Sequence, residues 1–116
     1  MPYISSTITM KLSDEKKDIL KAKLGKLMQD VLGKSEDWLF VGFNEEETIY
    51  FKGEKKEKAA VIEVKILGIK SNKEKETFTS EVCKTFTKEL SISGENIYVI
   101  FTEVAQGNWG WNGGMF

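Results

Sequence analysis

The chain alternates apolar and amphipathic segments in the order strand, helix, strand, and this order occurs twice. Apolar residues at helical spacing predict the helices, and runs of β-branched and aromatic residues predict the strands. The expected elements are a strand at 3–10, a helix at 14–32 between Ser13 and Gly33, strands at 38–43, 48–52 and 59–67, a helix over 78–90 and a strand at 97–102. Each β-α-β unit should cross over right-handed, so that its two strands are parallel.

The joins between helix and strand indicate an internal duplication. GKSEDWLFVGF after the first helix parallels SISGENIYVIF after the second, with an offset of 58 or 59 residues. Two such units would merge into one four-stranded mixed sheet with both helices on one face, which is an α+β fold. A length of 116 residues fits a single domain, residues 1–116.

The strands also predict an oligomer. WLFVGF and IYVIF have almost no polar alternation, so the sheet face that the helices leave open should be apolar. The chain has no further element to cover that face, and self-association around a symmetry axis would cover it. The alternative is that some of these apolar positions lie at sheet edges or under loops.

The ionisable residues exclude several kinds of site. The chain has 17 lysines and 18 acidic residues, for a net charge of −1, and it has no arginine and no histidine. This composition excludes Ser-His and Cys-His nucleophile pairs and His-ligated metals, and it argues against nucleic acid as a partner. No apolar run could span a membrane and no signal-peptide pattern opens the chain, so we expect a cytoplasmic protein. The one cysteine, Cys83, should be inert core.

Pro2, the only proline, directly follows Met1. Removal of Met1 would leave a secondary amine at the start of a strand. Burial or a nearby cation lowers the pKa of such an amine, which could then act as a general base in a chain without histidine. With Met1 attached, the Pro2 nitrogen is a tertiary amide and no base. The alternative is that the Met-Pro start has no catalytic meaning.

Four more side chains each allow two interpretations. Lys34 either caps the first helix or holds a substrate carboxylate. Trp109 and Trp111, in a glycine-rich tail without regular periodicity, either pack against a neighbouring subunit or wall a pocket for an aromatic ligand. Tyr98 is either a core aromatic or a phenol pointing into a cleft.

Six short motifs in order along the chain are MPYI at 1–4, Gly33-Lys34, YFKG at 50–53, ILG at 66–68, IYV at 97–99, and Trp111-Asn112-Gly113 with Phe116. Their ordered combination resembles the macrophage migration inhibitory factor family of the tautomerase superfamily. The similarity covers essentially the whole chain.

The resemblance implies a homotrimer of β-α-β-β-α-β subunits with active sites at the subunit interfaces. It implies keto–enol tautomerisation of phenylpyruvate-like aromatic keto acids, with Pro2 as the base and with no metal or other cofactor. The other implied site residues are Lys34 for the substrate carboxylate, Leu67 for a backbone N–H contact, Tyr98 from the adjacent subunit, and Trp111 and Phe116 as aromatic walls.

The chain departs from the family pattern at several positions. Ile100 stands where animal members carry an asparagine, Ser35 stands in place of a proline, and Trp109 is bulkier than the expected aliphatic residue and could narrow the pocket. Ala59 and Ile62 occupy the positions of the animal CxxC pair, so a thiol–disulfide activity is not supported.

Two other functions stay open. The chain could be a cytokine-like ligand of a host receptor, secreted without a signal peptide, with a vestigial pocket. It could also be a plain structural oligomer.

Overall fold

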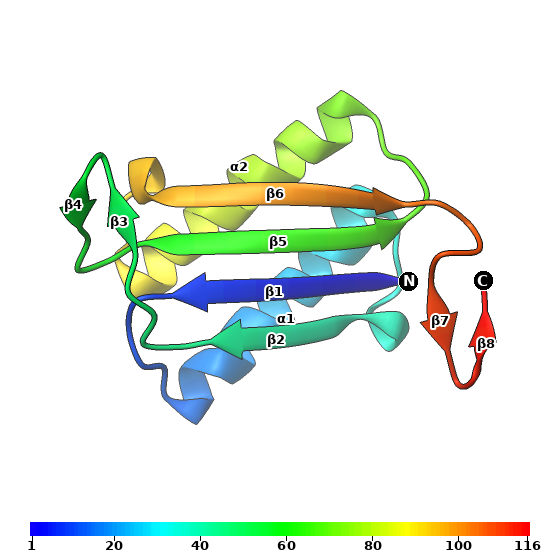
Figure 1. The fold of residues 1–116 in the computed structure, drawn as a ribbon, viewed down its shortest axis with the longest axis horizontal. Helices are drawn as coiled ribbons and strands as arrows, with labels where there is room; N and C mark the ends of the chain where they lie inside the picture. Colours follow the sequence, from blue (N-terminus) through cyan, green and yellow to red (C-terminus); the bar gives the residue numbers. More distant parts are fainter.

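The computed structural model describes residues 1–116 and shows two helices packed on one face of a four-stranded sheet (Figure 1). The sheet strands are β1 (Pro2–Ile8), β2 (Phe40–Asn44), β5 (Ala60–Leu67) and β6 (Ile97–Val104). The helices are α1 (Asp14–Leu32) and α2 (Asn72–Leu90). Two small hairpins pair β3 (Tyr50–Phe51) with β4 (Glu54–Lys55), and β7 (Gly110–Trp111) with β8 (Gly114–Met115).

The sheet has the strand order β2-β1-β5-β6. β1 is parallel to β2, β5 is parallel to β6, and β1 is antiparallel to β5 in the centre. The predicted architecture of two parallel β-α-β units in one mixed sheet is therefore confirmed. The register places Pro2 opposite Ile66, and Ile66 opposite Glu103. The start of β1 and the ends of β5 and β6 consequently lie at one end of the sheet.

The core lies between the sheet and the helices. β5 alternates along its length, so that Ala60, Ile62, Val64 and Ile66 are buried against the helices. The helices cover these strand residues with one apolar face each, made of Leu20, Leu24, Met28 and Leu32 from α1 and Phe78, Val82, Phe86 and Leu90 from α2. Neither helix combines the length and hydropathy needed to cross a lipid bilayer.

The helix ends explain where sequence periodicity succeeds and fails. α1 begins after Ser13, whose Oγ accepts a hydrogen bond from the Lys16 N–H, and ends at Gly33 with φ 64°. α2 begins at Asn72 rather than near Phe78, because Ser71 and Glu74 form a capping box. The first turn of α2 is polar, so the apolar pattern alone places the start of the helix too late.

Three other boundaries differ from expectation. Residues 36–38 form a short 3₁₀ helix, η1 (Glu36–Trp38), so β2 begins at Phe40 rather than at residue 38. The tail is not irregular, because β7 and β8 pair as a hairpin. The expected strand at 48–52 and the charged turn after it form the β3–β4 hairpin, with Lys52 and Gly53 at positive φ.

The two joins share a local structure that fits the proposed duplication. η1 precedes β2, and a second 3₁₀ helix, η2 (Gly94–Asn96), precedes β6. Both follow a serine in extended conformation, Ser35 and Ser93. The sequence parallel between these segments therefore corresponds to a structural one.

The open face of the sheet is less apolar than expected. On this face β1 presents Tyr3, Ser5 and Thr7, and β5 presents Val61, Glu63, Lys65 and Leu67. The prediction of an apolar face is thus wrong for the two central strands. Large exposed apolar side chains gather instead on the two edge strands, where Phe40 is 70% exposed and Ile100 is 46% exposed.

Candidate functional site

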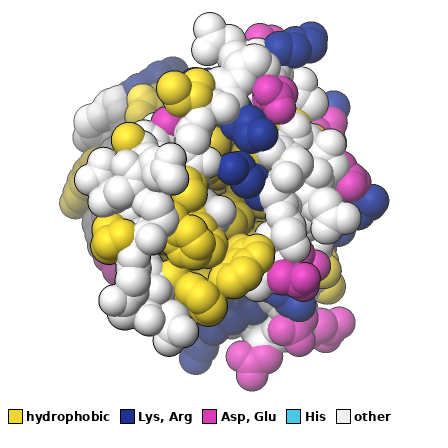
Figure 2. Space-filling view, turned by 90° about the vertical axis from the view of Figure 1, so that its right-hand side faces the viewer, with side chains coloured by type: hydrophobic (Ala, Val, Ile, Leu, Met, Phe, Trp, Pro, Cys, Tyr) yellow, Lys and Arg dark blue, Asp and Glu magenta, His cyan; other side chains and the backbone are white.

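A hollow of about 640 Å³ opens at the end of the sheet where β1 begins. It is formed by the start of the chain, η1, the start of β2 and the β7–β8 hairpin. Figure 2 shows this end, where apolar side chains gather in a depression with lysine side chains beside it. The lining residues are Met1, Pro2, Tyr3, Asp37, Trp38, Phe40, Trp109, Gly110 and Trp111.

Pro2 is buried at the inner edge of the hollow. It is the first residue of β1, and its register opposite Ile66 fixes it in the sheet. Met1 extends this pairing, since the Leu67 N–H donates a hydrogen bond of 3.1 Å to the Met1 carbonyl oxygen. The backbone of Leu67 therefore lies directly beside the start of the chain.

Lys34 approaches the start of the chain from the helix layer. It follows Gly33, the C-cap of α1, and its N–H donates to the Met28 carbonyl oxygen at 3.2 Å. Its Nζ, however, donates to the Leu67 carbonyl oxygen at 2.8 Å. The ammonium thus binds the end of β5 and does not cap the helix, and its role toward a substrate carboxylate stays a prediction.

The electrostatics of this corner favour neutral amines. Burial, and then the charge of Lys34, lower the pKa of the Met1 amine below its ordinary value. Burial, and then the charge of Lys70, lower the pKa of Lys34. The Met1 amine therefore loses its proton more readily here than in water.

Aromatic side chains from three segments wall the hollow. The rings of Trp38 and Trp111 meet edge to face with centroids 4.9 Å apart, and Trp111 lies 6.3 Å from Phe116. The tail is held by hydrogen bonds from the Phe116 N–H to the Trp109 carbonyl oxygen at 2.9 Å, and from the Gly107 N–H to the Phe116 carbonyl oxygen. The structure therefore brings Trp109, Trp111 and Phe116 to the same end of the sheet as Pro2.

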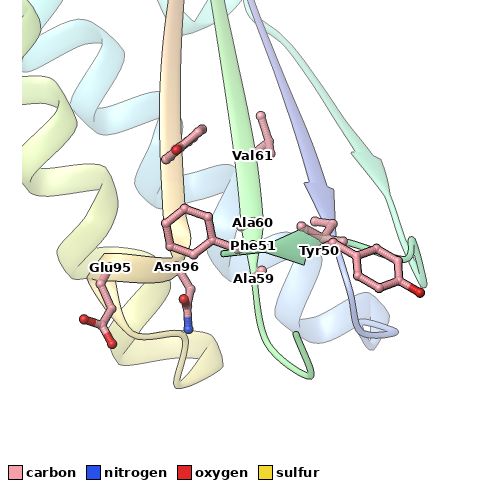
Figure 3. A pocket seen from close by; sticks show the side chains of 9 residues that line it. Tyr50, Phe51, Ala59, Ala60, Val61, Glu95 and Asn96 are labelled. Carbon is pink, nitrogen blue, oxygen red and sulfur yellow. The ribbon is translucent and has the colours of Figure 1, made fainter. Parts of the chain in front are cut away.

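Tyr98 is the predicted site residue that the chain does not bring to this hollow. It lies at the start of β6, five residues before Glu103, and this separation corresponds to about 17 Å along the strand. Its side chain is 58% exposed and packs edge to face on Phe51 at 5.8 Å, so it is not a core aromatic. It lines a separate pocket of about 110 Å³ with Phe51, Val61 and Asn96 (Figure 3).

Several residues of this region are absent from the predicted site, among them Asp37, Trp38 and Phe40, which line the hollow. Trp38 belongs to η1 and not to the strand expected at 38–43. It is the last residue of the polar segment that follows Lys34, and that place in the sequence is the signal that separates it from β2. Lys70 lies in the loop after β5, close enough to lower the pKa of Lys34. No motif marks Lys70, and only the fold reveals its position.

Sequence and structure comparisons agree on the relationship of this chain. A family model described as macrophage migration inhibitory factor (MIF) matches residues 1–116. The chain belongs to the MIF family. Macrophage migration inhibitory factor of Xenopus tropicalis is 24% identical over 103 residues, which are 89% of this chain and 89% of that protein.

Solved structures of MIF relatives share the fold. The crystal structure of Leishmania major MIF2 is 30% identical, with a TM-score of 0.91 over 100% of this chain and 97% of that one. A protein crystallised after inactivation by 2-oxo-3-pentynoate is 19% identical, with a TM-score of 0.86 over 97% of this chain and 93% of that one. The two-helix, four-stranded architecture is therefore that of the MIF family.

This MIF family member has distinctive residues around the hollow. Ser35 replaces the expected proline, and its Oγ accepts a hydrogen bond of 3.1 Å from the Asp37 N–H at the start of η1. Trp109 is half-buried and occupies part of the wall. Cys83 lies half-buried on α2, where burial raises the pKa of its thiol, as expected of an unreactive cysteine.

Proposed function

We propose that this chain is a cofactor-independent keto–enol tautomerase of phenylpyruvate-like 2-keto acids, with Pro2 as the general base once Met1 is removed. One observation carries the proposal. The start of the chain is buried beside the Lys34 ammonium and the Leu67 backbone, at the edge of a hollow walled by tryptophans. A base of lowered pKa, a cation and an aromatic wall are what an aromatic keto acid requires.

Removal of Met1 would have two chemical effects at this corner. It would convert the Pro2 nitrogen from a tertiary amide into a secondary amine that can accept a proton. It would also free the Leu67 N–H, which donates to the Met1 carbonyl oxygen in the unprocessed chain. The base and a hydrogen-bond donor would therefore become available together.

The reaction follows from these groups. The substrate carboxylate pairs with Lys34, and the ring lies against Trp38 and Trp111. The Pro2 nitrogen takes a proton from the carbon between the ring and the carbonyl, the C–H electrons form the C=C bond, and the carbonyl π electrons move to oxygen. The Leu67 N–H donates to that oxygen as its charge grows. The protonated Pro2 amine then gives its proton to that oxygen, which forms the enol, restores the neutral amine and leaves the net charge of the substrate unchanged.

We further propose that the active assembly is a homotrimer with sites between subunits. Tyr98 could reach the hollow only from a neighbouring subunit, because it lies at the other end of its own sheet. The edge strands β2 and β6 carry unpaired backbone groups and exposed apolar side chains, which suits strand-edge contacts between copies. Sedimentation or light scattering measures the subunit number, and a monomeric mass would contradict this part of the proposal.

The decisive experiment uses protein whose N-terminus is shown by mass spectrometry to be Pro2. Phenylpyruvate tautomerisation is measured for this protein, for Pro2→Gly and for protein that retains Met1. We expect both altered forms to lose activity by about 100-fold or more, since a positioned base contributes at least that much. Full activity in Pro2→Gly would exclude Pro2 as the base.

A covalent probe gives an independent readout. 2-Oxo-3-pentynoate, which inactivates the structural neighbour described above, is an electrophilic keto acid. An amine of lowered pKa at Pro2 should add to its alkyne and gain the mass of one inhibitor molecule. Peptide mapping should place the adduct on Pro2, and protein retaining Met1 should stay unlabelled there. Labelling confined to lysine side chains would contradict the proposed reactivity of Pro2.

The cytokine-like function has its support in the name of the Xenopus relative, macrophage migration inhibitory factor. It is separable from catalysis by the same variant. Receptor binding and signalling that survive in Pro2→Gly, with no tautomerase activity in the processed wild type, would favour this alternative.

A further inference from the structure

Gly25 is a buried glycine inside helix α1. Glycine is a poorer helix former than alanine, so a glycine at this place indicates a packing requirement. The Glu36 side chain supplies that requirement, because it lies directly over Gly25. A Cβ atom at position 25 would overlap the Glu36 carboxylate, 2.5 Å from its Cδ, and would lie 3.0 Å from the Cγ. The missing side chain of Gly25 therefore makes room for Glu36 on the surface of α1.

The contact between Gly25 and Glu36 is one of packing rather than of charge. Glu36 takes part in none of the ion pairs of the protein. Lys21, four residues before Gly25 on α1, lines a second depression together with Glu36, and both side chains are exposed to water. Water screens the attraction between such exposed charges. The fit of the Glu36 side chain to a helix surface without a Cβ atom is therefore what joins it to α1.

The short helix η1 connects this contact to the aromatic wall of the hollow. Glu36 is its first residue and Trp38 is its last. The Leu39 N–H donates a hydrogen bond of 3.0 Å to the Glu36 carbonyl oxygen, which closes the turn around Trp38. The Trp38 ring lines the hollow and meets Trp111 edge to face, with centroids 4.9 Å apart. A displacement of Glu36 on α1 should therefore move the Trp38 ring.

We propose that Gly25 and Glu36 are positioning residues, which set the place of Trp38 against Trp111 in the wall of the hollow. Neither residue lines the hollow itself, so both act through η1. The inference rests on the proposed function for the ligand, an aromatic acid whose ring lies against Trp38. It extends that function by making the binding of the ring depend on a contact on the surface of α1.

The Trp38–Trp111 pair provides a direct spectroscopic readout. Two tryptophan rings in contact give an exciton couplet in circular dichroism, and Trp38→Phe identifies the couplet that belongs to this pair. We expect Gly25→Ala to weaken the couplet because the new methyl group displaces Glu36, and Glu36→Ala to weaken it because the contact is gone. Glu36→Gln keeps the size of the side chain and should keep the couplet. A couplet as weak in Glu36→Gln as in Glu36→Ala would contradict a packing contact.

Binding of an unreactive acid measures the consequence for the hollow. The probe is 3-phenylpropionate, which has the ring and the carboxylate but no keto group, and tryptophan fluorescence reports its binding to the processed protein. We expect Gly25→Ala and Glu36→Ala each to weaken binding by about two- to fivefold, the size of one aromatic contact. With phenylpyruvate the same variants should raise KM by a similar factor and leave kcat unchanged.

A double variant tests whether the two residues act through one contact. When position 36 is already alanine, the methyl group of Gly25→Ala has nothing to displace, so the double variant should lose no more than one single variant. Gly94→Ala makes the same substitution in η2, where a Cβ would meet no atom within 4 Å, and it should change neither readout. Losses that add in the double variant, an equal loss in Gly94→Ala, or an unchanged couplet in both single variants would each overturn the inference.

The same measurements distinguish this inference from the proposed function. If the couplet and the affinity for 3-phenylpropionate fall in Gly25→Ala and Glu36→Ala, but the processed wild type does not turn over phenylpyruvate, the positioning role stands and the tautomerase proposal fails. If turnover depends on Pro2 but the couplet, the affinity and KM stay unchanged in both variants, the tautomerase proposal stands and the positioning role is wrong.

Discussion

The two ends of the sheet differ in size and chemistry. The end where β1 begins has a hollow of about 640 Å³ with three tryptophans, Lys34 and the start of the chain. The opposite end has a pocket of about 110 Å³ that is mainly apolar and carries the phenol of Tyr98 (Figures 2 and 3). The four-stranded sheet separates them, so Tyr98 of one chain does not reach the hollow of the same chain. The proposed role of Tyr98 in catalysis therefore depends on a neighbouring subunit.

The largest effect should come from mixing variants that damage opposite ends. Pro2→Gly removes the base from one end, and Tyr98→Ala removes the phenol from the other. In trimers reassembled from equal amounts of both, about a quarter of the interfaces would join an intact Pro2 to an intact Tyr98. Phenylpyruvate turnover should therefore rise to about a quarter of wild type, well above the mean of the separate variants. Activity no greater than that mean would indicate that each site lies within one subunit.

Lys34→Gln should have the next largest effect, confined to the end with the hollow. Loss of the carboxylate partner should raise KM by about tenfold. The Lys34 charge lowers the pKa of the Met1 amine in the unprocessed chain. We expect the same charge to act on a Pro2 amine beside it, so removal of the charge should raise the pKa of Pro2. The base is active when neutral, so the acidic limb of kcat/KM against pH should move to higher pH. A limb that stays in place or moves to lower pH would contradict this electrostatic role.

Glu103→Gln and Glu89→Gln form a matched pair at the two ends. Glu89 accepts from Lys23 Nζ at 2.5 Å and from Lys16 Nζ at 3.3 Å, which joins α2 to α1 far from the hollow. We expect both variants to have a lower Tm at neutral pH. Only Glu103→Gln should also raise KM, by about two- to threefold, because it loosens the loop after β5, and the Lys34 ammonium binds the Leu67 carbonyl oxygen where that loop begins.

The pH dependence of stability checks this pair further. Folding lowers the pKa of Glu103, mainly through the Lys70 N–H, and that of Glu89, mainly through Lys23. These carboxylates therefore stabilise the protein above the unfolded carboxyl pKa of about 4.3, and the stabilisation is lost as pH falls through the folded value. The difference in Tm between each variant and wild type should shrink in acid. A constant difference would mean that charge is not the cause.

The smallest effect is expected at Ile100, on the same exposed face as Tyr98. Ile100→Asn restores the polar residue of the animal MIF pattern and leaves the end with the hollow unchanged. We expect a change in kcat/KM of about two- to fivefold, the range of one exposed hydrogen bond, with an unchanged Tm. Steady-state kinetics with phenylpyruvate measures it. A change above about a hundredfold would show that this position contacts the reacting atoms directly.

The sequence predicts the sheet and helices because their determinants are local. The period of apolar residues sets the buried faces of α1 and α2, and the β-branched runs set β1, β5 and β6. Prediction from the apolar pattern fails where hydrogen bonds set the boundary, as in the capping box that starts α2 at Asn72. Sequence-based prediction also fails for the β7–β8 hairpin, because strands of two residues are too short to show a period.

The site is predictable to a different extent. Pro2, Lys34 and Trp111 are visible in motifs, and the fold brings them to one end of the sheet. Lys70 is not visible, because one more lysine in a lysine-rich chain carries no pattern. Glu103 holds the loop that contains Lys70, and that contact joins residues 33 positions apart. Long-range contacts of this kind become evident only in the folded structure.

The bond between the Leu67 N–H and the Met1 carbonyl oxygen has a consequence for the timing of maturation. An aminopeptidase needs a free, extended end of the chain, and this bond holds the end in the sheet. Trimming should therefore be most efficient on the nascent chain, before the two central strands meet at the ribosome. A molecule that folds before Met1 is removed would keep Met1, and in the proposed mechanism its blocked Pro2 nitrogen would leave it inactive.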